Sequence, residues 1–160
     1  MVSATLRGLA LVILTLVLVG CSVGPVVVDA PRLAESEQPQ CRDFIGELPA
    51  IVAGFERREI ESPGGFAAAW GAPPLIVTCG GQLPDDFTQL SGCEEIAGIG
   101  WFTPDAQLED PTLAATVTTV GIHPLATVSI PAQRRGNAAE ILTAVAPAIK
   151  QSLLSTEPCV

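Results

Sequence analysis

Residues 113–130 read LAATVTTVGIHPLATVSI. Two runs rich in Thr and Val, 113–120 and 125–130, flank the segment Gly121-Ile122-His123-Pro124. β-Branched side chains favour strands, whereas Gly and Pro favour turns. The stretch therefore predicts a β-hairpin, with Pro131 ending its second strand.

Further strands are expected on the N-terminal side of this hairpin. Residues 96–102 and the apolar run 75–79 are predicted to be strands, and the charged run 55–61 is expected to be an exposed strand. The Ala-rich residues 66–70 are expected to form a short helix. Together with the hairpin, these segments predict a domain whose centre is dominated by β-strands.

A helix is expected at each end of the domain. Residues 40–54 carry an apolar face at helical spacing, with a kink at Pro49. The second helix follows Asn137, which is expected to cap it with Glu140 as its capping-box partner, and carries an apolar stripe from Ile141 to Leu153. This order predicts an α+β fold: a mainly antiparallel sheet with the N- and C-terminal helices packed on one face.

The N-terminal residues predict a signal peptide over 1–20. Residues 9–19 are apolar except for Thr15, which is too short for a bilayer-spanning helix but suits a secretory signal. The run ends in Leu18-Val19-Gly20-Cys21, which resembles the lipobox of bacterial lipoproteins. In those proteins the cysteine becomes the lipid-bearing N-terminus. We therefore expect Cys21 to carry the lipid, with the protein on the extracytoplasmic face of the cell membrane.

The charge of the expected mature chain excludes some partners. Seven Lys and Arg stand against 17 Asp and Glu after Cys21, a net charge of −10. Such a chain lacks the basic surface of a nucleic-acid binder, and anionic lipids should repel it. Residues 21–38 contain three prolines and no sustained period, so they predict a flexible tether before a single domain at 39–160. Pairing of Val26–Val28 as an edge strand is the alternative.

Four cysteines remain after Cys21. They are Cys41, Cys79, Cys93 and Cys159, and in an oxidising compartment they predict two disulfides, for which three pairings are possible. The chain has no C-x-x-C motif and one histidine, His123, so neither a metal site nor a cofactor is expected.

No catalytic set is recognisable in the sequence. The acidic pairs Asp85-Asp86, Glu94-Glu95 and Glu109-Asp110 suit solvated loops better than general acid–base chemistry. Arg57-Arg58 and Arg134-Arg135 are expected to pair with surface carboxylates, or alternatively to clamp an anion. Because neighbours on a strand point to opposite faces, at most one Arg of each doublet could serve a given pocket.

The two tryptophans allow two interpretations. Trp70 and Trp101, with Arg57, could line a ligand groove, whereas a core plug is the favoured interpretation for Trp70.

Several of these pieces occur together in a known family. They are the lipobox, C-x-x-F-x-x-x-L-P at 41–49, Arg57-Arg58, A-W-G-x-P-P at 69–74 followed by Cys79-Gly80, and G-x-G-W-F at 98–102. The chain thus resembles the bacterial lipoproteins grouped as domain of unknown function 3515, found in actinobacterial-type envelopes. The resemblance implies the pairs Cys41–Cys79 and Cys93–Cys159. Thr78 and Ala72 depart from the Arg and Asp common in that family.

The sequence therefore favours a lipid-anchored accessory or interaction domain of the cell envelope. Its partners are expected to be the membrane, through Cys21, and an envelope protein. A small-ligand-binding lipoprotein is the alternative, and a hydrolase using the loop carboxylates ranks third.

Overall fold

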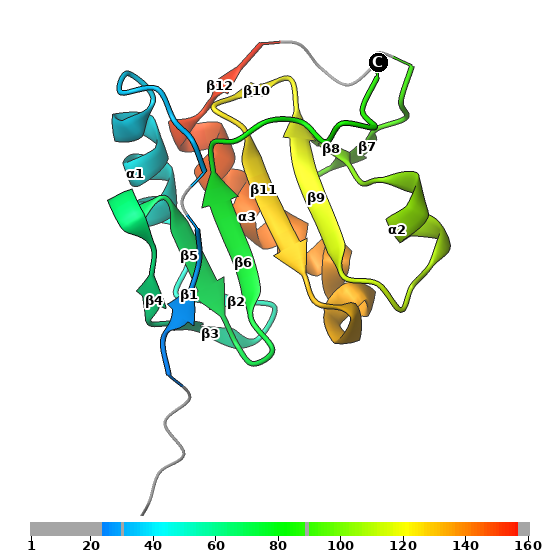
Figure 1. Cartoon of the computed structure of the whole chain (residues 1–160), viewed down its shortest axis with the longest axis horizontal. Coiled ribbons are helices and arrows are strands. Elements are labelled where there is room, and N and C mark those ends of the chain that lie inside the picture. The colour runs from blue at the N-terminus through cyan, green and yellow to red at the C-terminus, as the bar shows by residue number, and fades with distance from the viewer. Residues whose placement is uncertain (1–23, 30, 89, 157–160) are drawn as a thin grey trace, which may run out of the picture.

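An eight-stranded sheet forms the centre of the molecule in the computed structural model, which describes residues 24–29, 31–88 and 90–156 (Figure 1). Its strand order is β2-β3-β5-β6-β11-β9-β8-β7, and every neighbouring pair is antiparallel. The strands are β2 (Ile51–Val52), β3 (Phe55–Arg58), β5 (Ala67–Trp70), β6 (Leu75–Cys79), β7 (Glu94–Ile96), β8 (Ile99–Phe102), β9 (Ala115–Val120) and β11 (Ala126–Ile130).

Two short strand pairs lie outside this sheet. Strand β1 (Val26–Val27) is parallel to β4 (Ile60–Glu61), and β10 (Ile122–His123) is antiparallel to β12 (Leu154–Ser155). The helices are α1 (Gln38–Glu47), α2 (Asp105–Glu109) and α3 (Ala138–Ser152), with 3₁₀ turns η1 (Pro63–Gly65) and η2 (Ala132–Asn137).

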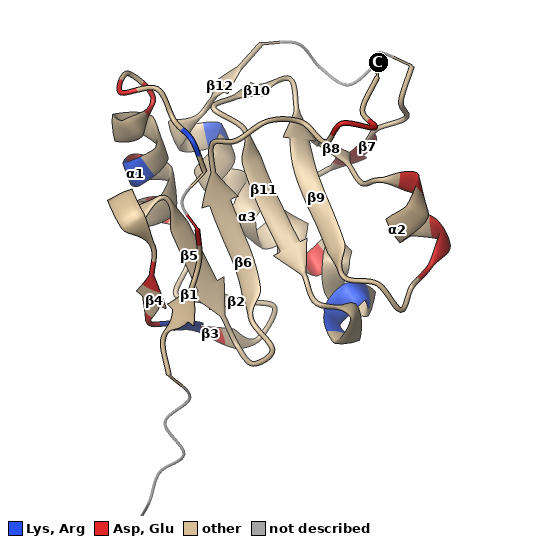
Figure 2. Ribbon diagram, viewed as in Figure 1, with Lys and Arg blue, Asp and Glu red and all other residues tan. Residues whose placement is uncertain are grey.

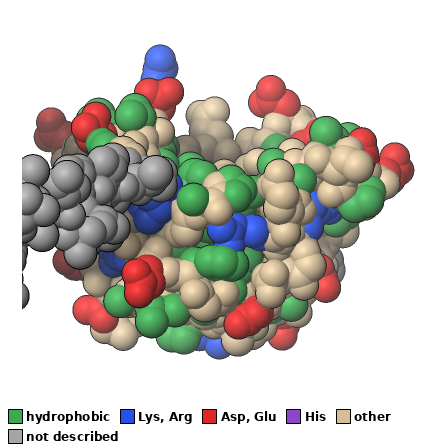
Figure 3. Space-filling view, turned by 90° about the horizontal axis from the view of Figure 1, so that it is seen from below, with side chains coloured by type: hydrophobic (Ala, Val, Ile, Leu, Met, Phe, Trp, Pro, Cys, Tyr) green, Lys and Arg blue, Asp and Glu red, His purple; other side chains and the backbone are tan. Residues whose placement is uncertain are grey.

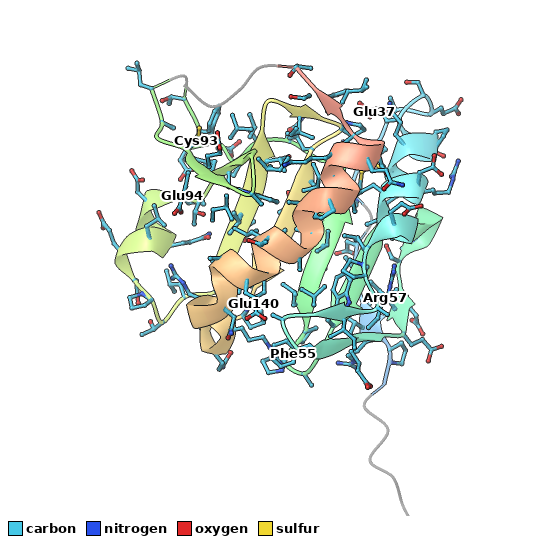
Figure 4. The ribbon with its side chains drawn as sticks, turned by 180° about the vertical axis from the view of Figure 1, so that it is seen from behind. Glu37, Phe55, Arg57, Cys93, Glu94 and Glu140 are labelled. Atoms are coloured by element: carbon cyan, nitrogen blue, oxygen red, sulfur yellow. A yellow bond between two sulfur atoms is a disulfide. The ribbon has the colours of Figure 1, made fainter. Side chains whose placement is uncertain are left out.

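The two long helices cover one face of the sheet. Helices α1 and α3 contact each other, and both lie on the same side of the sheet (Figure 4). The strands alternate accordingly: in β6 and β11 every second residue is fully buried against the helices. The predicted α+β fold is confirmed, as is the hairpin, in which Thr127 pairs with Thr118.

The sequence predicted a short helix over residues 66–70, and this prediction is wrong. Ala67–Trp70 form strand β5 instead. Ala67–Trp70 pair with β6 on one side and, through Ala69 and Trp70, with β3 on the other. All four residues of the strand are buried. Alanine has no strong preference in the sheet, so its two neighbouring strands, rather than its own propensity, determine the conformation.

The first helix is shorter than expected. Helix α1 ends at Glu47, and Leu48 is already extended, with φ −64° and ψ 137°. A residue before proline is disfavoured in the α conformation, so Pro49 ends the helix rather than kinking it. Ile51 and Val52 then form β2 instead of a further helical turn.

The expected tether is wrong for the described part of residues 21–38. The amide of Val26 donates to Glu59 O and that of Val28 to Glu61 O, both at 3.0 Å. Val26 is buried, and Leu33 packs against the core. We call the described segment before α1, residues 24–29 and 31–37, the arm. Burying its apolar side chains and pairing its amides stabilises the arm against the domain more than solvation as a coil would.

The capping box expected at Asn137 does not form. The amide nitrogen of Asn137 donates to the Glu140 carboxylate at 3.3 Å, and neither side chain caps the backbone. The turn η2 leads directly into α3, and Ala138 N–H bonds to Arg135 O. The backbone of η2 therefore satisfies one of the amide groups that a capping side chain would otherwise satisfy.

Candidate functional site

A cavity of about 540 Å³ opens beside strands β7, β8 and β9, where the start of α3 and the short helix α2 meet the sheet. Trp101, Val117 and Leu142 line its apolar part. Glu94, Asp105 and Arg135 bring charged side chains to it. We call this hollow the Trp101 cavity.

Small residues create the space for this cavity. Gly136, Ala138 and Ala139, at the entry to α3, lie across from Ala115 and Val117 of β9. A longer side chain at these helix positions would fill the gap between helix and sheet. Further along α3 the larger Val145 and Ile149 are fully buried, so the helix closes onto the sheet there.

Trp101 is held by the hairpin of β7 and β8. Its indole N–H donates to Ile96 O at 3.3 Å, and only 2% of the residue is exposed. Glu94 pairs directly with Trp101 across the two strands. Successive strand residues point to opposite faces, so Glu94 borders the cavity and Glu95 points away from it.

Arg135 joins two elements at the other side of the cavity. Its Nη1 donates to Asp110 O at 2.8 Å and to Leu113 O at 3.3 Å. These bonds fix the loop before β9 to η2. The cavity can thus offer an apolar floor, a guanidinium and two carboxylates to an amphipathic ligand.

The groove of Trp70, Trp101 and Arg57, which was the alternative interpretation, does not form. Trp70 is fully buried, and its indole N–H donates to Pro49 O at 3.0 Å. Four strand spacings separate β5 from β8, which places Trp70 and Trp101 about 19 Å apart in the sheet. The core-plug interpretation of Trp70 is confirmed.

Arg57 belongs with Trp70 rather than with the cavity. Its Cζ lies 5.6 Å from the centre of the Trp70 ring. Its guanidinium donates to Leu48 O at 3.1 Å and to Ile45 O at 2.9 Å, which satisfies carbonyls at the end of α1 (Figure 4). Partial burial lowers the pKa of Arg57 from its ordinary value, and the side chain remains a cation.

The other members of the two arginine doublets also bind backbone carbonyls. Arg58 donates to Gly71 O and Gly24 O, and Arg134 donates to Ala72 O and Pro73 O. The sequence predicted pairing with surface carboxylates, but among the described residues the one ion pair joins His123 to Glu37, at 2.7 Å. Arg57 and Arg58 do point to opposite faces, as expected of neighbours on a strand.

The cysteines agree with the sequence prediction as far as they are described. Cys41 and Cys79 form a disulfide with an S–S distance of 2.04 Å, which ties α1 to β6. Cys93 is also disulfide-bonded. Its expected partner Cys159 and the lipidation residue Cys21 lie outside the described residues, so Cys93–Cys159 stays a prediction.

The acidic pairs of the sequence do not converge within the described residues. Asp85 and Asp86 lie in the loop between β6 and β7, and Glu94 and Glu95 diverge on their strand. No group of three or more His, Cys, Asp or Glu in the described ranges could hold a metal ion. The fold instead brings Glu94, Asp105 and Arg135 to one cavity, a set that no local pattern in the sequence announces.

The fold and the cavity define the chain as a disulfide-bonded α+β domain with an amphipathic hollow. The chain belongs to the family described as "Protein of unknown function (DUF3515)", whose family model matches residues 3–158. No curated protein and no solved structure matches it. None of the helices described here is long and apolar enough to cross a bilayer.

Proposed function

We propose that the chain is a lipid-anchored accessory domain of the bacterial cell envelope that works by binding a partner protein. The lipobox at 18–21 supports the anchor, and the disulfide Cys41–Cys79 suits an oxidising compartment. The surface around the Trp101 cavity supports the binding role.

Exposed leucines around the cavity carry this proposal. Six large apolar residues are exposed in the described ranges, and three of them belong to segments that border the Trp101 cavity. Leu108 lines the cavity and is 58% exposed, Leu113 is 44% exposed, and Leu90 is 97% exposed. Apolar side chains left in solvent around a hollow with a charged rim are typical of a protein-binding surface.

A photo-cross-linker in intact cells tests this role. Benzoylphenylalanine replaces Leu108 in one variant and Leu154 in another, because Leu154 is equally exposed at 57% but lies on β12, away from the cavity. We expect one envelope protein to be captured from position 108 and not from position 154. Capture of the same proteins from both positions, or of none, contradicts a binding surface at the cavity.

Small-ligand binding is the second candidate, and the volume of the cavity favours it. About 540 Å³ lies within the range of small-molecule sites, with an apolar floor and a few charged groups. A panel of amphipathic metabolites should then raise the melting temperature of the wild-type protein. Ala139→Leu fills the cavity from α3 and should abolish that shift, and a shift that survives this change places the ligand elsewhere.

A further inference from the structure

The first described residues are fixed to one end of the domain. Arg58 donates through one nitrogen to Gly24 O and through another to Gly71 O. Gly24 therefore lies beside the turn between β5 and β6. We define the anchor end as Gly24, β3, the turn 71–74 and η2, which lie together at the bottom of Figure 1.

The contacts of Arg134 and Arg135 hold this end together. Arg134 binds the carbonyls of the 71–74 turn, with Nε to Pro73 O at 3.0 Å and Nη2 to Ala72 O at 2.9 Å. Arg135 reaches the loop before β9. The anchor end is therefore a rigid surface rather than a collection of free loops.

The spacer between lipid and domain is short. Gly24 is three positions after Cys21, and an extended chain spans at most about 3.5 Å per position, or about 10 Å here. The flexible tether expected from the sequence would have held the domain farther away. A spacer of this length leaves the anchor end as the part nearest to the lipid.

The charges are distributed unevenly in the same direction. Four of the seven Lys and Arg after Cys21 come from β3 and η2: Arg57, Arg58, Arg134 and Arg135. In the view from below, basic atoms form a band across the middle of this end among apolar atoms, and acidic side chains lie mostly around its rim (Figure 3). Glu56 of β3 is the one acidic residue within the anchor end, and Figure 2 shows the other acidic residues spread over the remaining elements. The net charge of −10 is therefore not the charge that this end presents.

We propose that the anchor end faces and contacts the bilayer surface, with Arg57, Arg58 and Arg135 toward anionic head groups and the domain upright on the membrane. Arg134 is buried and holds this end together from inside. This inference rests on the proposed lipid anchor at Cys21. Juxtamembrane arginines are attracted to anionic lipids within a Debye length, and about 10 Å of spacer keeps them there. The anchor end, rather than the Trp101 cavity, is then occupied by the membrane.

Photo-cross-linking to lipid tests the orientation. The full chain, matured in its host and purified with its lipid, is reconstituted into vesicles of phosphatidylcholine with phosphatidylglycerol. Benzoylphenylalanine stands at Pro73 of the anchor end or at Leu154 of β12, both of which are exposed. We expect at least fivefold more phospholipid adduct, measured by mass spectrometry, from position 73. Equal adduct from both positions, or more from position 154, overturns the orientation.

The intact mass of the purified chain separates the anchor from the contact. The intact mass shows whether Cys21 carries acyl chains, and a chain without them refutes both the anchor and the inference. An acylated chain that gives no adduct at position 73 refutes the inference alone.

Inserting twelve Gly and Ser residues between Val23 and Gly24 should lower the adduct severalfold, and an unchanged yield refutes the role of the short spacer. Pure phosphatidylcholine should lower the yield as well, and equal yields refute the contribution of the arginines.

Discussion

The guanidinium carbon of Arg134 lies 3.5 Å from the centre of the Phe55 ring, and the residue is only 7% exposed. The same guanidinium donates to two carbonyls of the 71–74 turn. A buried cation thus connects η2, β3 and the turn between β5 and β6 without any carboxylate partner among the described residues.

Arg134→Ala should lower the free energy of unfolding by about 2–4 kcal/mol, because it removes charged hydrogen bonds and a cation–π contact together. Urea denaturation measures the change. Arg134→Lys keeps the charge but loses the planar fork, and it should recover less than half of the loss. Arg42→Ala is the matched control, since Arg42 is exposed and lies 5.9 Å from the Phe66 ring centre. A loss at Arg42 as large as that at Arg134 contradicts this account.

The disulfide Cys41–Cys79 should stabilise the fold through the unfolded state. Its two residues are 38 positions apart, and closing a loop of this size stabilises by about 3–4 kcal/mol in the chain-entropy model. The free energy of unfolding of the double variant Cys41→Ala/Cys79→Ala should therefore be lower by about this amount. Urea denaturation measures it, with a midpoint at lower urea concentration. An unchanged midpoint would contradict a stabilising role of the cross-link.

Gly80 is expected to tolerate no side chain. Its φ is +100°, and a Cβ there would lie 2.6 Å from the Leu33 side chain. Gly80→Ala should cost about 1–3 kcal/mol and speed hydrogen exchange at the amides of Val26 and Val28, because the arm that carries Leu33 must move. Gly46→Ala is the control: its Cβ would meet nothing within 4 Å, and alanine favours the helix. Unchanged exchange in the Gly80 variant would mean that the arm is held without Leu33.

Asp110 should make the fold sensitive to acid. Hydrogen bonds from the Thr112 side chain and backbone, with a smaller contribution from the charge of Arg135, hold the pKa of Asp110 below its ordinary value of 3.8. A pKa that is lower in the folded state gives stability that is present above about pH 4 and is lost as the pH falls through the folded pKa. Asp110→Asn should flatten the acid limb of a plot of stability against pH. An acid limb that is as steep in the variant would assign the effect to another carboxyl.

A second variant tests how much the Thr112 side chain contributes to the lowered pKa of Asp110. Thr112→Val removes the side-chain donor, whose Oγ1 lies 2.6 Å from Asp110 Oδ1, and leaves the backbone bond at 2.8 Å. Its acid limb should fall between those of the wild type and Asp110→Asn. At pH 7 each variant should lose as much stability as disappears from its acid limb, and this loss should be small because the turn is exposed.

Local pattern predicted the elements whose side chains alternate or recur along the chain. The runs of β9 and β11 are rich in Thr and Val and flank a segment with Gly and Pro, so their composition identified them. The apolar stripe from Ile141 to Leu153, at helical spacing, identified helix α3. Strand β5 has four small or aromatic buried residues and no alternation, so only its neighbours in the sheet could identify it.

The site depended on long-range contacts that no local pattern encodes. The Trp101 cavity draws Glu94, Asp105 and Arg135 from three elements that the topology brings together. The partners of the arginines are backbone carbonyls, which carry no sequence signal of their own. Arg134 and its acceptors Ala72 and Pro73 lie about 60 positions apart in the chain.

The arm that carries β1 also determines how the domain responds to a pulling force. Two backbone hydrogen bonds hold β1 against β4, from Val26 and Val28. In the lipid-anchored form proposed above, a pull on Cys21 would peel this strand away first and release residues 24–40. Those 17 residues span about 60 Å when extended, and the covalent bond from Cys41 to Cys79 stops the peeling at the centre of the sheet. If Cys21 is anchored as proposed, the disulfide sets the greatest height to which a stretched arm could lift the folded domain above the membrane.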